Sequence, residues 1–412
     1  MAQSPHTVRW GILATGFIAQ SESTTTRLLT QWHAAAATTV FVRDLLCNPA
    51  TRDVTDVAHK VVAVASSRSK ESAAGFLDKV NLAPEGVKLY GSYDELVNDP
   101  DVDCVYVATP HSHHFQNAML ALQAGKNVLC EKAFTVTASQ AKKLAAAAKE
   151  KNVFLMEAVW TRYFPLSIKI RELVKSGAIG TVYRVIADNS VGSDGPDGSL
   201  TFADEHRMVN VDLAGGALLD LGIYSLTWLF QILYHLQPEA EKETPQTLAA
   251  IQQYKTGADE STSVIVSFPG HKTQGIALTS LRVATNTDGK NSGGPAIKIQ
   301  GTLGEIQVMG PAYRPTQYKI VKKDGDGQVE VVDCPIPVDR ERRFGMGMFW
   351  EADEVARCLR DGKKESATLP LSESIVIMEV MEEALKQGSV KYPDVITTDV
   401  FDPKSPLNTG AR

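Results

Sequence analysis

The chain has 412 residues, 43% of them hydrophobic, and a formal net charge of −6. This length allows two domains with full-sized cores, and the composition is that of an ordinary globular protein. The negative balance gives no electrostatic case for a nucleic-acid partner. Residues 1–8 are polar, so neither a signal segment nor a membrane partner is expected, and no apolar run is expected to be long enough to span a bilayer.

Short apolar runs alternate with helical patterns from the start of the chain to about Glu157. Alternating β and α units predict an α/β fold, with a doubly wound parallel sheet of the Rossmann type and helices on both faces. We assign this first domain to residues 1–157. The expected strands are 10–13, 59–65, 88–90, 102–108, 127–130 and 153–156, and the expected helices are 70–80, a short one capped by Ser92, 115–124 and 138–149.

A different pattern begins after residue 157, with two early helices and then a run of strands. It predicts a second, α+β domain at 158–412, built on a large, mostly antiparallel open sheet. The expected helices are 165–175, an apolar one after Gly215-Gly216, 348–360 and 374–387, and the expected strands are 247–254, 261–268, 275–283, 296–300, 306–309, 318–321 and 329–332.

The first strand-to-helix turn reads Ala14-Thr15-Gly16-Phe17-Ile18-Ala19. This is a G-x-G-x-x-A fingerprint whose first glycine is replaced. Backbone N–H groups at such a helix start hold a dinucleotide pyrophosphate, so we expect cofactor contacts from Ala14, Thr15, Gly16, Phe17 and Ile18. The alternative is that these small residues only allow close packing.

The second strand is followed by Ser66-Ser67-Arg68. A site for NAD would have a carboxylate here for the ribose 2′-hydroxyl, and none occurs before Glu71. Hydroxyls followed by a guanidinium suit a 2′-phosphate, which favours NADP. The alternative is an ordinary solvated helix start.

Two further stretches follow strands of the expected parallel sheet, at the edge where ligands bind in such folds. The first runs from Thr109 and Pro110 through His111 to His114, and the second contains Glu131 and Lys132. Zinc is disfavoured because no Cys or carboxylate lies at a ligand-like spacing from the histidines, so we predict no metal site. Lys132 is expected to project into the crevice, although an ordinary exposed lysine is the alternative.

A glycine-led helix start, Gly215-Gly216, places Asp220 and Tyr224 four residues apart on one helix face. A phenol with an ordinary pKa of about 10 needs a nearby cation to act as a base near neutrality. The alternative is that Asp220 caps the helix and Tyr224 packs. No P-loop, G-x-S-x-G or H-E-x-x-H motif is present, which disfavours the commonest hydrolases and NTPases.

Together these stretches resemble the glucose–fructose oxidoreductase/inositol dehydrogenase (Gfo/Idh/MocA) family. In that family the corresponding lysine, aspartate and Tyr/His form the catalytic group, so the resemblance implies this role for Lys132, Asp220 and Tyr224. It also implies cofactor contacts from Thr109, Pro110, His114, Glu131 and Lys132. Ala133 departs from the family pattern, because proline is usual after the Glu-Lys pair, and Ala14 stands in place of a glycine.

The stretch Met156–Pro165 and the tail from Thr397 to Gly410 resemble one branch of that family, which holds dimeric dihydrodiol dehydrogenases and fungal NADP-dependent D-xylose 1-dehydrogenases. The branch implies NADP, a small sugar substrate, and oxidation of D-xylose to D-xylono-1,5-lactone by hydride transfer. Tyr224 would accept the C1 hydroxyl proton, Lys132 would lower the phenol pKa, and Asp220 would orient the lysine or a substrate hydroxyl. Substrate contacts are expected from His111, Trp160, Arg162 and Tyr224.

Two other functions stay open. One is the oxidation of trans-1,2-dihydrobenzene-1,2-diol, which the same branch performs. The other is a non-catalytic NADP sensor, against which Lys132 and Tyr224 argue together. The resemblance also implies that the second domain serves substrate binding and oligomerisation, with a homodimer through the C-terminal sheet. The five cysteines are odd in number and far apart, which indicates reduced thiols and a cytoplasmic location.

An insertion of about nineteen residues, Ser21 to Thr39, interrupts the helix that follows the fingerprint. One explanation is a retained intron, because Ser21-Glu22-Ser23 can be encoded with a splice-donor sequence. A genuine insertion is the alternative. We expect a protruding loop or helical excursion between Gln20 and Phe41, with Thr38-Thr39-Val40 disfavouring helix and residues 41–46 docked on the sheet.

Overall fold

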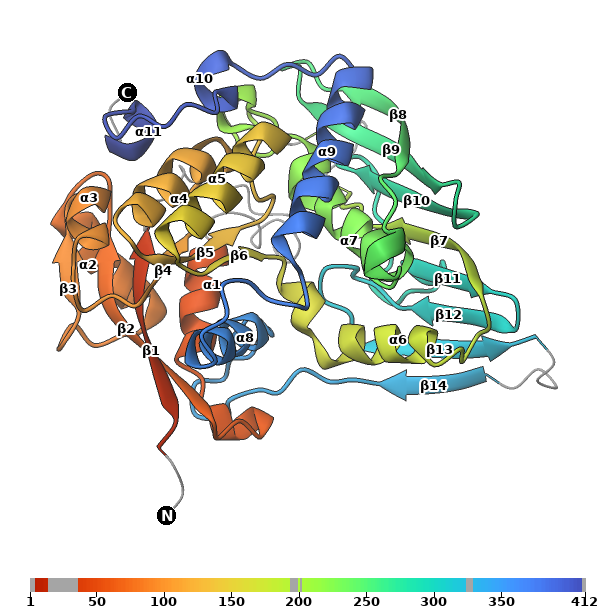
Figure 1. The fold of residues 1–412 in the computed structure, drawn as a ribbon, viewed down its shortest axis with the longest axis horizontal. Coiled ribbons are helices and arrows are strands. Elements are labelled where there is room, and N and C mark those ends of the chain that lie inside the picture. The colour runs from red at the N-terminus through yellow and green to blue at the C-terminus, as the bar shows by residue number, and fades with distance from the viewer. Residues whose placement is uncertain (1–3, 14–35, 193–198, 201, 324–328, 410–412) are drawn as a thin grey trace. The chain divides into compact units, whose positions relative to one another are not determined.

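The computed structural model describes residues 4–13, 36–192, 199–200, 202–323 and 329–409 (Figure 1). The chain divides into two compact units. Unit 1 comprises Met1–Trp160, Ile336–Ser374 and Asp394–Arg412, and unit 2 comprises Thr161–Pro335 and Ile375–Pro393. The division after residue 160 lies close to the expected boundary. The C-terminal part differs from the expectation, because two of its segments, 336–374 and 394–412, belong to unit 1.

Unit 1 is built on a six-stranded sheet in the order β3-β2-β1-β4-β5-β6, and every neighbouring pair is parallel. This confirms the doubly wound α/β prediction. The strands are β1 (His6–Leu13), β2 (Val57–Ala65), β3 (Lys88–Tyr90), β4 (Cys104–Val107), β5 (Asn127–Glu131) and β6 (Leu155–Ala158). The helices are α1 (Ala36–Leu45), α2 (Lys70–Val80), α3 (Tyr93–Val97), α4 (His114–Gln123), α5 (Ala138–Lys151), α8 (Phe349–Arg360), α10 (Asp394–Thr397) and α11 (Pro406–Thr409), with the 3-10 turns η2 (Pro49–Arg52) and η3 (His111–His113).

Neighbouring residues of β1 show that helices cover both faces of this sheet. The Trp10 ring makes an edge-to-face contact with Phe41 of α1, at a centroid distance of 5.4 Å. On the other side of the strand, a Cβ at Gly11 would lie 2.8 Å from Leu96 of α3. Since successive strand residues point to opposite faces, α1 and α3 lie on opposite sides. Figure 1 shows α4 and α5 packed side by side.

Helix α1 corrects one sequence prediction. Thr38, Thr39 and Val40 lie inside the helix, although β-branched residues disfavour it. The fully buried Phe41 and Val42 that follow supply the packing that overrides this local preference. Residues 41–45 are docked as expected. The rest of the predicted excursion, 21–35, lies outside the described residues.

Helix α8 joins unit 1 through a buried polar network. Arg52 donates from Nε and NH2 to the two oxygens of Asp353, each at 2.8 Å, and His59 Nε2 lies 2.9 Å from Asp353 Oδ1. Trp10 Nε1 donates to His59 Nδ1 at 3.2 Å, so the neutral ring carries its proton on Nε2. The buried charges of Arg52 and Asp353 therefore compensate each other. This pair attaches the C-terminal helix α8 to the N-terminal part of unit 1.

Unit 2 is built on an eight-stranded sheet in the order β14-β13-β12-β11-β7-β10-β9-β8. Only the β7–β10 pair is parallel, so the prediction of a mostly antiparallel sheet is confirmed. The strands are β7 (Val182–Asp188), β8 (Gln246–Gln253), β9 (Asp259–Phe268), β10 (Thr273–Ser280), β11 (Ile297–Gly301), β12 (Gly304–Val308), β13 (Gln317–Lys322) and β14 (Val329–Asp333). The helical segments are η4 (Trp160–Tyr163, whose first residue belongs to unit 1), α6 (Pro165–Lys175), η5 (Val211–Leu213), a π-helix (Leu218–Gly222), α7 (Ile223–Leu233), η7 (Glu239–Glu241) and α9 (Leu371–Gln387, whose first turn belongs to unit 1).

Strand β7 was missed in the sequence. It lies inside the sheet, between β11 and β10. Only Val185 and Ala187 are fully buried, and Arg184 interrupts the apolar run. A strand with one solvated face carries too few apolar residues to be distinguished from a loop.

The segment Val211–Leu233 is long and apolar enough to cross a membrane by length and composition, contrary to the expectation that no run would be. However, 94% of its apolar window is buried inside the structure. α7 packs on β7 and β10. The segment, which includes the π-helix and α7, therefore lies in the core of unit 2, and its hydropathy reflects burial against the sheet.

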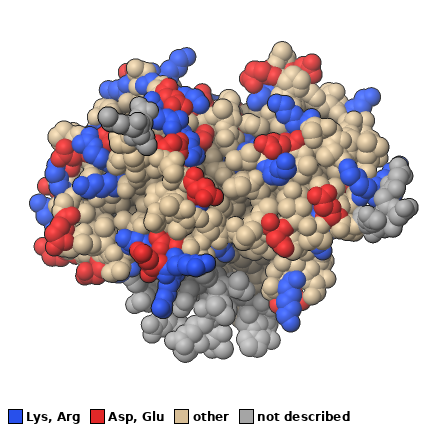
Figure 2. Space-filling view, turned by 90° about the horizontal axis from the view of Figure 1, so that it is seen from below, with Lys and Arg blue, Asp and Glu red and all other residues tan. Residues whose placement is uncertain are grey.

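Positive and negative side chains are interspersed on the face of the described residues that Figure 2 shows. This mixture agrees with the small net charge of −6. On this face, the described residues give no single-sign field that would attract a polyanion.

Candidate cofactor site and catalytic residues

The turn after β5 carries Lys132, and unit 1 fixes this turn from several sides. Tyr106 of β4 donates its hydroxyl to Glu131 Oε1 at 2.5 Å, and the Lys132 N–H donates to Glu131 Oε2 at 3.2 Å. The Phe134 N–H donates to Glu157 Oε1 of β6 at 3.0 Å. Among residues 131–136, Lys132 is the only one that is not buried. The fold therefore presents this lysine at the carboxyl edge, as predicted.

Burial strongly perturbs Glu157. The carboxyl is fully enclosed, and this desolvation raises its pKa from 4.5 to about 7, with further upward contributions from Glu131 and Glu373. The hydrogen bond from Phe134 acts in the opposite direction. The Lys132–Ala133 peptide bond is cis, at the position where Ala133 replaces the usual proline.

The turn after β4 is joined to the Lys132 turn through His114. Its Nδ1 lies 2.8 Å from the Ala133 carbonyl oxygen, and its Nε2 lies 2.9 Å from the Thr109 carbonyl oxygen. Burial lowers the His114 pKa to about 4. A neutral ring has one N–H, so it donates to one of these carbonyls at a time. His114 thus acts as a spacer between the two turns.

The same turn offers one unused donor. The Thr109 hydroxyl is buried and has no hydrogen-bond partner among the described residues. Such a group needs a partner, which a ribose or carboxamide of a bound dinucleotide can supply. Pro110 directly precedes the 3-10 turn η3, and the His111 ring contacts His114 edge to face at 5.6 Å. The predicted residues Thr109 to His114 therefore lie at the expected edge.

The histidines do not form a metal site within the described residues. No group of three or more His, Cys, Asp or Glu side chains suited to a metal is found there. His113 instead pairs its Nδ1 with Ser112 Oγ at 2.8 Å. The ring nitrogens of His114 face carbonyl oxygens, which leaves them poorly placed as ligands.

The turn after β2 fits a phosphate. The buried Ser66 accepts the Arg68 N–H at 3.2 Å, and Ser69 caps α2 by accepting the Ser72 N–H. Arg68 is exposed, Ser67 is partly exposed, and no carboxylate precedes Glu71. This turn therefore carries hydroxyl side chains and an exposed arginine directly before the N-terminus of an eleven-residue helix, and these groups suit a 2′-phosphate. The predicted pyrophosphate residues Ala14, Thr15, Gly16, Phe17 and Ile18 lie outside the described residues.

In unit 2, the glycine-led turn is shaped by Asp259. Asp259 Oδ2 accepts the Leu218 N–H at 2.7 Å at the start of the π-helix, and burial raises the Asp259 pKa to about 6. Gly216 has φ 139°, and a Cβ there would collide with Asp259 Oδ1. A glycine is therefore required for this carboxyl to reach the helix start. The π-helix that follows contains Asp220, and such irregular turns are frequent at functional sites.

Asp220 is paired with Arg207. The guanidinium reaches both carboxylate oxygens, NH1 to Oδ1 at 3.3 Å and NH2 to Oδ2 at 3.0 Å. The side chains are 13% and 4% exposed, so the two charges depend on each other for compensation. Arg207 was not among the predicted site residues, because the segment around it has no periodicity that predicts an element.

Tyr224 is nearly buried in α7 and lies beside Tyr313, with ring centroids 5.8 Å apart. The loop that carries Tyr313 is anchored by two contacts. Trp228 Nε1 donates to the Ala312 carbonyl oxygen at 2.9 Å, and the Thr161 hydroxyl donates to the Tyr313 carbonyl oxygen. Tyr313 was missed because its loop, which follows a cis Gly310–Pro311 bond, carries no motif.

Two predicted substrate residues lie in η4. Trp160 is 7% exposed in unit 1, and Arg162 is fully buried in unit 2. The Arg162 carbonyl oxygen accepts a hydrogen bond from Arg171 at 3.1 Å. Substrate contact by these two residues stays a prediction.

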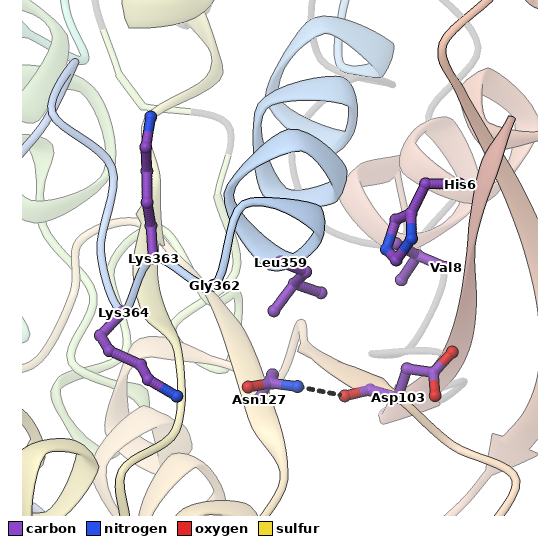
Figure 3. A pocket seen from close by; sticks show the side chains of 8 residues that line it. All are labelled: His6, Val8, Asp103, Asn127, Leu359, Gly362, Lys363 and Lys364. Carbon is purple, nitrogen blue, oxygen red and sulfur yellow. Dashed lines mark hydrogen bonds between the residues drawn. The ribbon is translucent and has the colours of Figure 1, made fainter. Parts of the chain in front are cut away.

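A cavity of about 280 Å³ in unit 1 lies at the opposite edge of the parallel sheet, next to His6 of β1 and Asn127 of β5 (Figure 3). Asn127 is engaged by backbone groups: its Nδ2 donates to the Asp103 carbonyl oxygen at 2.8 Å, and its Oδ1 accepts the Phe154 N–H at 2.9 Å. Lys364 donates to the Asn152 carbonyl oxygen at 2.7 Å. The polar lining therefore joins segments of the fold, and cofactors bind such sheets at the other edge.

Comparison with known proteins agrees with this geometry. Residues 9–159 match the model of an oxidoreductase family with an NAD-binding Rossmann fold, and residues 167–307 match the GFO/IDH/MocA C-terminal domain. The chain is 62% identical over 409 residues to D-xylose 1-dehydrogenase (NADP(+)) of Hypocrea jecorina, covering 99% of this chain and 98% of the relative. It is 32% identical to trans-1,2-dihydrobenzene-1,2-diol dehydrogenase of Bos taurus, covering 94% of this chain and 98% of the relative.

Solved structures share the fold at lower identity. An aldose–aldose oxidoreductase from Caulobacter crescentus superposes with a TM-score of 0.69 at 19% identity, covering 93% of this chain and 97% of that one. A 3-ketoreductase from Actinomadura kijaniata in complex with NADP gives 0.64 at 19% identity, covering 93% and 98%. The two domain matches, the doubly wound sheet with Lys132 at its carboxyl edge, and the open sheet of unit 2 lead to one conclusion: this chain belongs to the Gfo/Idh/MocA oxidoreductase family.

Proposed function

We propose that this protein oxidises D-xylose at C1, with transfer of hydride to NADP⁺ and release of D-xylono-1,5-lactone. The observation that carries the proposal is the 62% identity, along nearly the whole of both chains, to an NADP-dependent D-xylose 1-dehydrogenase. The turn at Ser66–Arg68 supports it independently, because its hydroxyls and guanidinium suit the 2′-phosphate of NADP.

Bound NADP⁺ would supply the hydride acceptor, and the residues of this chain would bind the cofactor, position the substrate and accept its proton. Arg68, Ser66 and Ser67 would hold the 2′-phosphate. The Thr109 hydroxyl, which has no partner among the described residues, would hydrogen-bond to the nicotinamide end of the cofactor. Pro110, His114 and Glu131 shape the same edge, as the family resemblance implies.

Tyr224 takes the proton of the C1 hydroxyl as hydride leaves C1. Lys132 favours the phenolate and stabilises the oxyanion that develops on the substrate. Asp220, held by Arg207, orients the hydroxyl or the lysine. His111, Trp160 and Arg162 shape the sugar pocket. These roles follow from the family resemblance. The carboxyl-edge position of Lys132 supports the role given to that lysine.

The test is the appearance of NADPH absorbance with purified protein. We expect D-xylose and NADP⁺ to give turnover, with NAD⁺ a much poorer acceptor. Turnover with trans-1,2-dihydrobenzene-1,2-diol and none with D-xylose would assign the chain to the activity named for its 32% identical relatives. Tight NADPH binding with no turnover on either substrate would indicate a sensor.

We further propose a homodimer through the sheet of unit 2. α7 covers one face of this sheet. The other face carries Ile265, Ile276 and Leu278, all partly exposed, next to Leu248, which is 66% exposed. Partly exposed apolar side chains on neighbouring strands suit a second sheet. Light scattering after chromatography should give the mass of a dimer, and the Ile276→Glu variant should give the mass of a monomer.

We also propose a cytoplasmic location, which the five free cysteines support.

A further inference from the structure

The C-terminal tail, residues 394–409, returns to unit 1 and contacts α4 and η3 (Figure 1). The sequence of this tail was among the most distinctive stretches of the chain, yet the proposed chemistry gives it no role. It contains two four-residue helices, α10 and α11, too short to be stable alone. Its conformation must therefore come from contacts with the rest of unit 1.

Gln140 on the first turn of α5 makes one set of these contacts. Its Nε2 donates to the carbonyl oxygens of Ile396 and Thr398, both at 2.8 Å. Its Oε1 accepts the N–H groups of Val136 at 3.1 Å and Thr137 at 3.3 Å. The side chain is buried, so one amide joins the tail to the segment that follows Lys132.

Gln116 and Asn117 on the first turn of α4 make the second set. Gln116 donates to the Val400 carbonyl oxygen at 2.9 Å and accepts the Asp402 N–H at 3.1 Å. Asn117 donates to the Leu407 carbonyl oxygen at 2.9 Å and to Asn408 Oδ1 at 2.8 Å. Both side chains are buried. The tail is thus held by side-chain amides on the first turns of α4 and α5, which bond to its backbone groups and to the Asn408 side chain.

These first turns follow the two segments that carry the candidate site in unit 1. α4 begins at His114, directly after Thr109–His113, and α5 begins six residues after Lys132. His114 already joins the two segments through the carbonyl groups of Thr109 and Ala133. The tail adds a second connection between them, from α5 through residues 396–402 to α4.

We propose that residues 394–409 form a clamp that sets the position of Lys132 and of the Thr109–His114 turn, with Gln140 as a positioning residue. The clamp acts by fixing the segment that follows Lys132 against α4. The inference rests on the proposed function, because it takes Lys132 as catalytic and both turns as part of the NADP site. It goes beyond that function in giving the tail a role in cofactor affinity and turnover.

Gln140→Glu in the full chain is the decisive variant. A glutamate keeps the oxygen that accepts the Val136 and Thr137 N–H groups and loses both donations to the tail, where it faces carbonyl oxygens instead. We expect kcat with D-xylose to fall, and KM for NADP⁺ and Kd for NADPH to rise, each about tenfold or more. Misplacement by about 1 Å produces losses of this order. The matched control is Gln123→Glu at the exposed end of α4, which should change none of these.

A truncation that removes residues 394–412 supplies the second arm. If the clamp is correct, Gln140→Glu has no further effect in the truncated protein, because the partner carbonyl groups are already gone. Folded Gln140→Glu protein with kcat, KM and Kd within twofold of the wild type overturns the proposal. A fall in kcat that matches the unfolded fraction, with KM and Kd unchanged, overturns it too, because the tail then only stabilises the fold. The Kd for NADPH tests the clamp even if the wild type does not oxidise D-xylose. Failure of the clamp and failure of the proposed function therefore give different results.

Discussion

Arg207 donates two hydrogen bonds, 3.3 and 3.0 Å long, to the Asp220 carboxylate within unit 2. Both side chains are largely buried. The aspartate that the family resemblance places in the catalytic group is therefore held as an ion pair by a residue without a recognisable motif. Its orientation is fixed before any substrate arrives, which limits the reorganisation that catalysis requires.

Loss of this arginine should be severe. Arg207→Met removes the guanidinium that faces the largely buried Asp220 carboxylate, and we expect the free energy of unfolding to fall by about 3 to 5 kcal/mol. Adding Asp220→Asn should restore most of the stability and leave activity low, because the charge of Asp220 is then missing. Lys255→Ala, which breaks an exposed ion pair with Asp204, is the control. It should leave the free energy of unfolding in chemical denaturation unchanged. Full activity in the double variant would remove Asp220 from the mechanism.

Lys132→Met should abolish turnover while NADPH still binds. The charge of the lysine serves the transition state more than the ground state, so kcat should fall by about 10²- to 10⁴-fold with little change in Kd. Steady-state kinetics and NADPH fluorescence measure the two quantities. Lys143→Met, on the exposed face of α5, is the control. A variant with near-normal kcat would exclude Lys132 as a catalytic group.

Ser66→Asp should change the cofactor preference. A carboxylate beside Arg68 repels the 2′-phosphate of NADP and can bind the 2′-hydroxyl of NAD. We expect KM for NADP⁺ to rise strongly and KM for NAD⁺ to change little. Ser66 is buried, so Ser66→Asn serves as a neutral control of similar size. Equal losses for both cofactors in the Asp variant would place the 2′-phosphate elsewhere.

Glu157 should make stability depend on pH. Its pKa is raised from 4.5 to about 7, so between these values the folded state holds a proton that the unfolded state has lost. The free energy of unfolding therefore falls as pH rises through this window, by up to about 3 kcal/mol for this shift. Glu157→Gln mimics the protonated form, so its stability should fall less over the same range. Parallel curves for the two proteins in urea titrations would show that the Glu157 pKa is not raised.

Deletion of Ser21 to Thr39 tests the insertion. It joins Gln20 to Val40, next to the buried Phe41, and should restore one continuous helix after the fingerprint. We expect a higher melting temperature and tighter NADPH binding, because the helix start gains packing. Thermal unfolding and fluorescence titration are the measurements. A lower melting temperature would show that the first turn of α1, which contains the buried Thr38, is a packed part of the fold.

Local patterns in the sequence were enough to predict much of unit 1. Helices α2 and α6 begin and end at the predicted residues, and Ser92 caps α3 by accepting the Glu95 N–H at 3.2 Å. Such features depend on side chains within a few positions of one another, so a single sequence contains them. The carboxyl-edge location of Lys132 follows from the parallel sheet alone, because every strand of such a sheet ends at the same edge.

Only the tertiary structure decided which distant segments meet. α8 and the tail belong to unit 1, although they lie hundreds of positions from β1 in the chain. The Arg52–Asp353 pair holds α8 there, and the Gln140 contacts hold the tail. Strand β7 gains its place from neighbours on both sides, although its own apolar signal is weak. Arg207 becomes important because Asp220 lies opposite its guanidinium. The family resemblance supplied candidate roles for individual side chains, but the partners that hold Asp220 and the Lys132 turn depend on long-range packing, which local periodicity does not encode.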